Sequence, residues 1–229
     1  MSFLASTAQR TIVNDPNVAL RSDIKGFHGI HVTNAIDLYL SQSDEEVVAV
    51  SAADPKWRDR IRTEVIGGIL HIYLDNRGFI WNGGKKMRAY ISFTHLDVLN
   101  ASGASDVYVD GVISGDNLEI KLTGASDFKG AIKVGSLKLD ASGASDAQIT
   151  GSVAGMTTIQ AHGASDLKGY DLVTDNCDAH VSGASDVRIT VNKELNAHAS
   201  GASSIYYKGE AVIRDLHSSG ASSVNKKKS

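Results

Sequence analysis

Five aspartates recur at an even spacing in the C-terminal half of this 229-residue chain. Each ends a Gly-Ala-Ser-Asp tetrapeptide, and they lie 21, 19, 20 and 20 residues apart: Asp106, Asp127, Asp146, Asp166 and Asp186. Carboxylate oxygens brought together by a repeat are suitable ligands for Ca²⁺. Calcium-binding β-rolls, however, use a nonapeptide with a different glycine spacing. We therefore interpret these aspartates first as structural corner residues, and keep cation binding and partner recognition as alternatives.

A second set of side chains with possible chemistry lies three residues before each repeat glycine. In the last three repeats this position holds His180, His198 and His217, and His162 lies close by. Imidazoles about 5 Å apart on neighbouring strands can bind Zn²⁺ or Cu²⁺, or take up protons together near pH 6. The simpler interpretation is a polar column that happens to be rich in histidine. These residues are therefore candidate metal ligands only, and we predict no cofactor.

The remaining reactive residue types give little evidence of catalysis. The chain has no GK[ST] phosphate loop, no HExxH and no nucleophile elbow, so we predict no catalytic residue. Cys177 has the parity of an inward-facing residue and is expected to be a small buried hydrophobe. Trp81, in the glycine-rich segment 76–86, is the best single candidate for partner binding, although a tryptophan that covers the core is an equally good interpretation.

The elements that position these residues follow from the repeat itself. The tetrapeptide recurs as Gly-Ala-Ser-Ser at Gly201–Ser204 and Gly220–Ser223, so seven copies follow one another at a period of 18 to 21 residues. Apolar residues stand two and four positions before each glycine and four after it, with polar residues between them. This alternation indicates strands with one buried face and excludes helical repeats. The period is also too short for a propeller blade. The sequence therefore predicts an all-β parallel β-helix (solenoid) of about seven coils of about 20 residues.

In stacked coils every position faces copies of itself above and below. We expect the glycine to supply a positive φ or a close backbone approach at a corner. The serine should point inward and bond a neighbouring coil, while the aspartate points outward and accepts backbone N–H groups of its own turn. Neighbouring carboxylates about 4.8 Å apart repel one another, which places them at an exposed edge.

The N-terminal half has strands without the tetrapeptide. Short alternating segments such as AIDLYLS, ILHIYLD and MRAYISF predict strands, and Asp54-Pro55 predicts the start of a helix of two or three turns, about 55–65. We expect an N-terminal extension (1–23), a β-rich region that is either a cap or a separate small domain (24–95), the β-helix (96–225) and a basic tail (226–229). A solenoid needs such an atypical terminal unit to cover its core.

The composition limits the classes of protein to which this chain can belong. The chain is 42% hydrophobic with a net charge of −3, which argues against disorder and against a nucleic-acid surface. No apolar run reaches the roughly 18 residues of a transmembrane helix, and the first ten residues, MSFLASTAQR, show no signal-peptide pattern. The chain has 22 glycines but only 2 prolines and 6% aromatic residues, consistent with a narrow core lined by alanine. An exposed sheet or open end makes a homo-oligomer possible.

At this level of detail the chain resembles a known family. The succession GFHGIHVTNAIDLYLSQSDEEVVAVSA, the short helix, GGILHIYLD, MRAYISFTHLDVLNASGASDVYV and the SGASD corners is similar to the "putative auto-transporter adhesin, head GIN domain" family of Bacteroidetes and other Gram-negative envelopes. The similarity extends over nearly the whole chain from about Ile24. It implies a β-helical, exported protein of the cell surface or periplasm, although no signal peptide is visible in this chain. No binding residues can be transferred.

Three functional hypotheses follow. The first is a non-enzymatic adhesin or structural module that binds a surface ligand, either a glycan or a protein. The alternative is a polysaccharide-active β-helix enzyme, which would need a distinct acid and base on one face. A third, an ice- or crystal-binding face, would need threonine arrays, whereas this sheet is expected to carry only the isolated Thr123 and Thr158.

Overall fold

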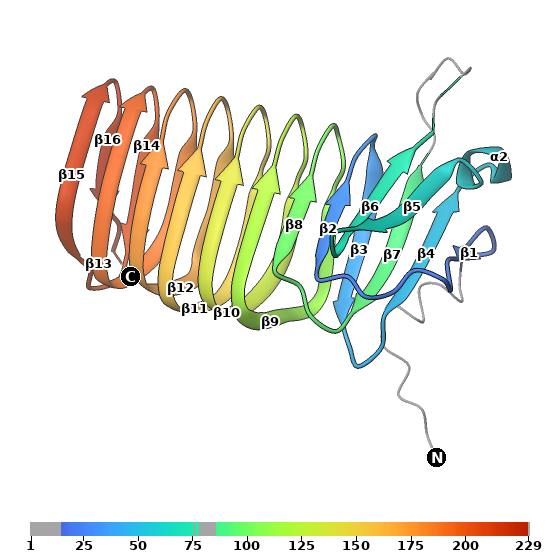
Figure 1. The fold of residues 1–229 in the computed structure, drawn as a ribbon. Helices are drawn as coiled ribbons and strands as arrows, with labels where there is room; N and C mark the ends of the chain where they lie inside the picture. The colour runs from blue at the N-terminus through green and yellow to red at the C-terminus, as the bar shows by residue number, and fades with distance from the viewer. Residues whose placement is uncertain (1–14, 76, 78–85, 229) are drawn as a thin grey trace.

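The computed structural model describes residues 15–75, 77 and 86–228. These residues form an elongated β-solenoid in which hairpin-like arches stack along one axis (Figure 1). The strands make two long faces that enclose one hydrophobic core from Ile24 to Tyr207. The all-β solenoid predicted from the repeat is therefore confirmed.

The repeat segment builds most of the rod. Each long strand bends once, so that its first half lies on one face and its second half on the other, and neighbouring strands pair in parallel through register shifts at the bend. The strands of this segment are β9 (Val107–Leu122), β10 (Phe128–Ala141), β11 (Ala147–Ala161), β12 (Asp166–Val181), β13 (Asp186–Gly201), β14 (Ser204–Lys208), β15 (Val212–Gly220) and β16 (Ser223–Lys226).

The N-terminal strands continue the same two faces in a different order. Strand β2 (Gly29–Val32) lies between β6 (Ile69–Leu74) and β8 (Val98–Ala101), and all three are parallel. On the other side, β3 (Ile36–Gln42) lies between β7 (Met87–Phe93) and β9, again in parallel. The coil formed by β2 and β3 therefore comes first in the sequence but second along the rod. The next strands in the sequence, β6 and β7, form the coil nearer the N-terminal end, and the chain then continues on the other side of β2 and β3 with β8 and β9.

We refer to the two sides as the first and second face. The first face holds β6, β2, β8, the second halves of β9–β13, and β15. The second face holds β7, β3, the first halves of β9–β13, β14 and β16.

Antiparallel strands close the N-terminal end of the rod. Strand β5 (Ile61–Ile66) pairs with β6, β4 (Val47–Ala52) pairs with β7, and β1 (Ala19–Leu20) pairs with β4. Between β4 and β5 the helix α2 (Pro55–Arg58) buries Trp57. Because these strands share the core of the coils, this part of the chain covers the end of the solenoid, and the described residues contain no second core of comparable size.

The helix is shorter than the two or three turns expected for residues 55–65. The side chain of Asp54 accepts a hydrogen bond from Lys56 N at 2.9 Å, and proline takes the first helical position, so the predicted start is confirmed. The helix then ends at Arg58 because Ile61, Thr63 and Val65 alternate with charged residues and pair with β6. Strand pairing here outweighs helical propensity.

The C-terminal end lacks such a cover among the described residues. All nine residues of β15 are exposed, including the apolar Ile213 and Leu216. An association of copies through this end remains a prediction.

The tetrapeptide forms the corner between the faces. Six serines, one per coil, are fully buried: Ser105, Ser126, Ser145, Ser165, Ser185 and Ser203. The Oγ of Ser145 accepts a hydrogen bond from Ser126 N at 3.3 Å, and the same bond repeats along the rod. The inward serine ladder is therefore present as expected. From Ser126 to Ser185, each serine provides a partner for the buried backbone N–H of the preceding coil.

The repeat glycines allow the coils to approach one another closely. Gly163 has φ +84°, and a Cβ added there would lie 2.5 Å from the carbonyl oxygen of Gly143 in the preceding coil. Gly111 has nearly the same φ, +81°, but has no atom within 4 Å of the corresponding Cβ position. A comparison of substitutions at these two glycines therefore distinguishes the free-energy cost of a positive φ from the cost of pushing neighbouring coils apart.

We expect Gly163→Ala to destabilise the fold much more than Gly111→Ala. A positive φ alone costs about 1–2 kcal/mol for alanine, whereas the clash at Gly163 adds about 1–3 kcal/mol by forcing the coils apart. The free energy of unfolding in urea, measured for both variants, checks this. Equal losses would show that stacking at the corner does not require glycine.

Candidate functional site

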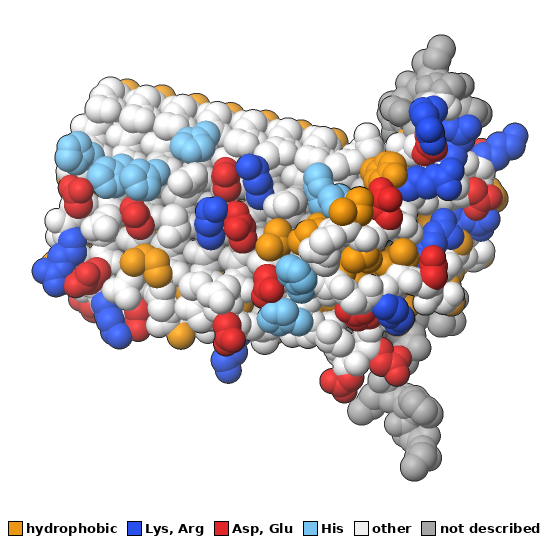
Figure 2. All heavy atoms as spheres, in the orientation of Figure 1, with side chains coloured by type: hydrophobic (Ala, Val, Ile, Leu, Met, Phe, Trp, Pro, Cys, Tyr) orange, Lys and Arg blue, Asp and Glu red, His pale blue; other side chains and the backbone are white. Residues whose placement is uncertain are grey.

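The three histidines singled out in the sequence lie side by side on the first face. His180, His198 and His217 are register partners on β12, β13 and β15. The His180 and His198 rings are stacked with centroids 4.5 Å apart at 2°, and those of His198 and His217 are 5.4 Å apart at 16°. Figure 2 shows histidine side chains gathered on this face over the C-terminal coils. Parallel pairing without a register shift between them keeps the rings together.

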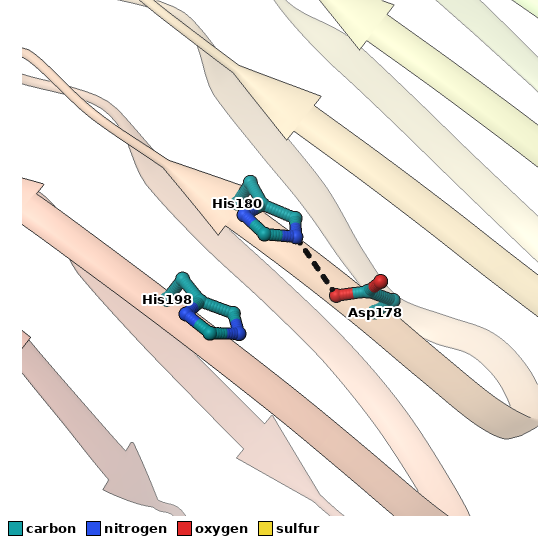
Figure 3. Close-up of side chains that lie close together, drawn as sticks. All are labelled: Asp178, His180 and His198. Carbon is teal, nitrogen blue, oxygen red and sulfur yellow. Dashed lines mark ion pairs between the residues drawn. The ribbon is translucent and has the colours of Figure 1, made fainter. Parts of the chain in front are cut away.

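Two carboxylates lie beside this histidine column. Asp178 and Asp215 stand two residues before His180 and His217, so each pair points to the same side of its strand. Asp178 Oδ1 lies 3.1 Å from His180 Nε2 (Figure 3). Asp215 lies 3.5 Å from His198 Nε2 and 3.4 Å from His217 Nδ1.

Asp178 and Asp215 were not singled out from the sequence. The signal was the Asp-x-His tripeptide at 178–180 and again at 215–217, with Asn196-x-His198 between them. We call the five residues Asp178, His180, His198, Asp215 and His217 the His/Asp cluster.

The surroundings of the His/Asp cluster are polar and open. A shallow depression of about 280 Å³ is lined by its histidines together with His162, Ser182 and other small residues. His162 Nδ1 lies 2.7 Å from Ser182 Oγ and does not point at the carboxylates of the cluster within bonding distance. The nearby cations are used elsewhere, since Lys193 pairs with Asp175 and Arg214 with Glu194.

The repeat aspartates form a separate column on the second face. Asp127 is exposed and the other four are partly buried. Their bonding differs from the expected one, because the Oδ1 of Asp127, Asp146 and Asp166 accepts the backbone N–H of the aspartate in the next coil, not of its own turn. Lys168 and Arg188 add ion pairs that offset the repulsion. In the described part of the chain, the groups with three metal-ligand atoms within 4.8 Å of one another both contain His198, and neither includes this column.

The aspartate column begins earlier than the repeat suggested. Asp37 occupies the same position one coil before Asp106, within the segment Asn34-Ala35-Ile36-Asp37. Asn34 adopts φ 66°, as the repeat glycines do, and Ile36 N donates to Ser105 Oγ at 3.2 Å. Burial, and secondly the charge of Asp106, raises the pKa of the Asp37 carboxyl. This degenerate repeat was missed because it has neither the glycine nor the serine.

A tyrosine stack lies next to the aspartate column. Tyr90, Tyr39 and Tyr108 are register partners on β7, β3 and β9, and both pairs of neighbouring rings stack with centroids 5.3 Å apart. Tyr108 is the most exposed of the three, with 37% of its surface accessible to solvent. Burial, followed by the nearby Asp106 carboxylate, raises the pKa of Tyr108 to about 12.

A groove of about 360 Å³ begins at the tyrosine stack. Its lining includes Tyr108, Lys129, Gln148 and Thr150. We call these four residues the tyrosine groove. The sequence signal was a tyrosine two residues after the first two aspartates of the column, in Asp37-Leu38-Tyr39 and Asp106-Val107-Tyr108.

The histidine column also has members at the N-terminal end of the first face. His31 and His71 occupy the same register on β2 and β6, with ring centroids 5.4 Å apart in an edge-on arrangement. Burial, and secondly the neighbouring His71, lowers the pKa of His31.

Two further residues complete the account of the sequence candidates. Cys177 is buried, and this burial raises the pKa of its thiol far above the ordinary value, so its sulfur is not poised as a nucleophile. Trp81 lies outside the described residues. Among the described residues, no helix has the length and apolar character needed to cross a membrane.

Comparisons with known proteins agree with this architecture. The profile of the family described as "Putative auto-transporter adhesin, head GIN domain" matches residues 26–211. No curated protein matches the chain.

Solved structures show the same fold at low sequence identity. A "putative adhesin" from Bacteroides fragilis is 20% identical, with a TM-score of 0.84 over 93% of this chain and 98% of that one. A "putative lipid binding protein" from Parabacteroides distasonis is 20% identical, with a TM-score of 0.70 over 93% and 97%. A "putative adhesin" from Parabacteroides merdae is 16% identical, with a TM-score of 0.70 over 93% and 97%.

The lowered pKa of His31 predicts a pH dependence of stability. The unfolded chain takes up a proton near the ordinary value of 6.5, whereas the native ring does so only at lower pH, so stability falls as the pH drops through this range. His31→Asn, which copies the next residue in the column, Asn100, should remove this loss. We expect the variant to lose less unfolding free energy between about pH 7.5 and pH 5.5, by under about 1 kcal/mol because the ring is partly solvent-screened. Identical pH profiles of the two proteins in urea unfolding would contradict it.

Proposed function

This chain belongs to the family described as "Putative auto-transporter adhesin, head GIN domain", and from this membership we propose that it is a non-enzymatic adhesin, exported to the cell surface or periplasm, that binds a glycan. The single observation that carries the ligand class is the tyrosine groove on the second face. The rod serves as a rigid support, because its faces are continuous parallel ladders around one core.

The tyrosine groove has the features that sugar binding requires. The exposed part of the Tyr108 ring offers an apolar surface for the C–H face of a sugar ring, and stacking on Tyr39 holds the ring in place. Lys129, Gln148 and Thr150 provide donors and acceptors for hydroxyl groups along the same groove. An apolar wall with a few placed polar groups is the usual composition of a small-ligand site.

The same geometry favours binding over cleavage. Glycoside hydrolysis generally needs a carboxylic acid and a carboxylate on either side of the scissile bond. Among the described residues, the lining of the groove includes no aspartate or glutamate. The neighbouring Asp127 and Asp146 are held in a ladder by backbone N–H groups, which gives them similar environments and not the contrasting ones of an acid and a base.

A glycan array probed with the full chain tests this proposal. We expect binding to a defined glycan, weakened at least about ten-fold in Tyr108→Ala because the aromatic platform is lost. Tyr206→Ala is the matched control, since Tyr206 lies in the same column at the opposite end of the face and should leave binding unchanged.

Three outcomes would contradict the proposal. Equal losses in the two variants would show that the tyrosine groove is not the site. Binding only to immobilised matrix proteins or to phospholipid vesicles would exclude a glycan ligand. Release of new reducing ends from the bound glycan would support the polysaccharide-active alternative.

A further inference from the structure

We propose that Asp178, His180 and His198 form a binding site for a single divalent transition-metal ion of the zinc class. The three residues lie on β12 and β13, and their candidate ligand atoms all lie within 4.8 Å of one another. Figure 3 shows the carboxylate of Asp178 beside the stacked rings of His180 and His198. This site is on the first face and is independent of the tyrosine groove.

The distances are close to those that a tetrahedral ion imposes. Two nitrogen or oxygen ligands about 2.0–2.2 Å from zinc lie roughly 3.3–3.6 Å apart. The 3.1 Å between Asp178 Oδ1 and His180 Nε2 is near this range. The centroids of the His180 and His198 rings lie 4.5 Å apart, and the candidate ligand atoms of all three residues lie within 4.8 Å of one another, so we infer that the His198 ring rotates to bring its nitrogen to the same ion.

The carboxylate of Asp178 is poorly satisfied by the protein alone. Its Oδ1 is shielded from solvent and, within the described residues, has no hydrogen bond of normal geometry, although His180 Nε2 is near. A buried carboxylate oxygen without an aligned donor is unfavourable. If the only role of Asp178 were to orient His180, an aligned hydrogen bond would be expected at this distance. A metal ion shared by both side chains accounts for the short but misaligned contact.

The donor set selects the class of ion. Two imidazoles and one carboxylate suit zinc, copper or nickel, whereas calcium and magnesium prefer oxygen ligands throughout. The strands are also rigid at this point, since Ala179 and Ala197, next to the two histidines, are fully buried and paired. Ligands on fixed strands lose little freedom on binding.

The cluster can hold one ion at a time. His198 belongs both to this group and to a second one with Asp215 and His217, and a neutral imidazole has one lone pair for a metal. We assign the ion to the first group because its side chains are less exposed, at 35% for Asp178 and 46% for His180 against 53% and 78% for Asp215 and His217. Three protein ligands leave a fourth position for water or for an oxygen of another molecule.

Isothermal titration of the metal-free full chain with ZnCl₂ tests the site. We expect one ion per chain, with affinity reduced at least about 100-fold in His198→Ala and at least about ten-fold in Asp178→Asn and His180→Ala. His217→Ala should change affinity less than about three-fold, because it belongs only to the second group. His71→Ala, in the same column at the other end of the face, is the matched control and should bind as the wild type does.

Circular dichroism of each variant checks that it is folded, and the visible spectrum of the Co²⁺-loaded chain should show tetrahedral coordination that His198→Ala abolishes. No heat with ZnCl₂ would overturn the proposal, as would unchanged affinity in His198→Ala. A loss in His217→Ala as large as in His180→Ala would place the ion in the second group and would also overturn it. None of these results depends on whether the chain binds a glycan.

Discussion

The close approach of equivalent backbone positions at the repeat corner is the constraint on which the rest of the structure depends. At Gly163 there is room for no atom beyond hydrogen on the side of the preceding coil, whose carbonyl oxygen would lie 2.5 Å from a Cβ. Only because this corner closes can the buried serines bond from coil to coil and the strands on both faces remain in parallel register. The corner therefore sets the register of every column on the surface, including those with chemistry.

Because the coils stack in register, each side chain on the surface lies next to the equivalent side chains of the neighbouring coils. Aspartates tolerate one another because each accepts a backbone N–H from the next coil, and because Lys168 and Arg188 lie among them. Tyrosines and histidines stack their rings instead. The same geometry thus makes a neutralised edge from the aspartates, a stack of aromatic rings from the tyrosines, and a column of imidazoles beside carboxylates from the histidines.

The sequence predicted the coils well because an exact tetrapeptide recurs with strict alternation around it, and the inward serine followed from parity alone. It did not reveal Asn34–Asp37 as a further corner, since asparagine supplies the positive φ there and Ile36 replaces the serine. Nor could it show that β2 lies between β6 and β8, because spatial order depends on long-range pairing. The helix was predicted too long for a similar reason. Residues Ile61–Ile66 form a strand that pairs with β6, and local helical propensity carries no information about such pairing. The histidine column could be predicted from the sequence. The part played by Asp178 could not, because it depends on the distance between its carboxylate and the His180 ring.

The candidate sites on this surface lie where a column of equivalent side chains changes from one residue type to another. Along the middle of the first face, the histidine column holds Asn100, Lys121, Asp140 and Gln160, of which Lys121 and Asp140 approach one another as an ion pair. Opposite charges of this kind offset each other, and among the described residues no group of three metal-ligand atoms lies in this part of the column. Where three histidines follow one another near the C-terminal end, no neighbour in the column offers a complementary charge, and the carboxylates two residues away become the partners. On the second face, three tyrosines stack on one another at the N-terminal end, and Lys129 and Gln148 are the next residues of that column, which returns to tyrosine at Tyr206. In the described part of the chain, the two candidate sites therefore lie on strands, at opposite ends of a regular solenoid.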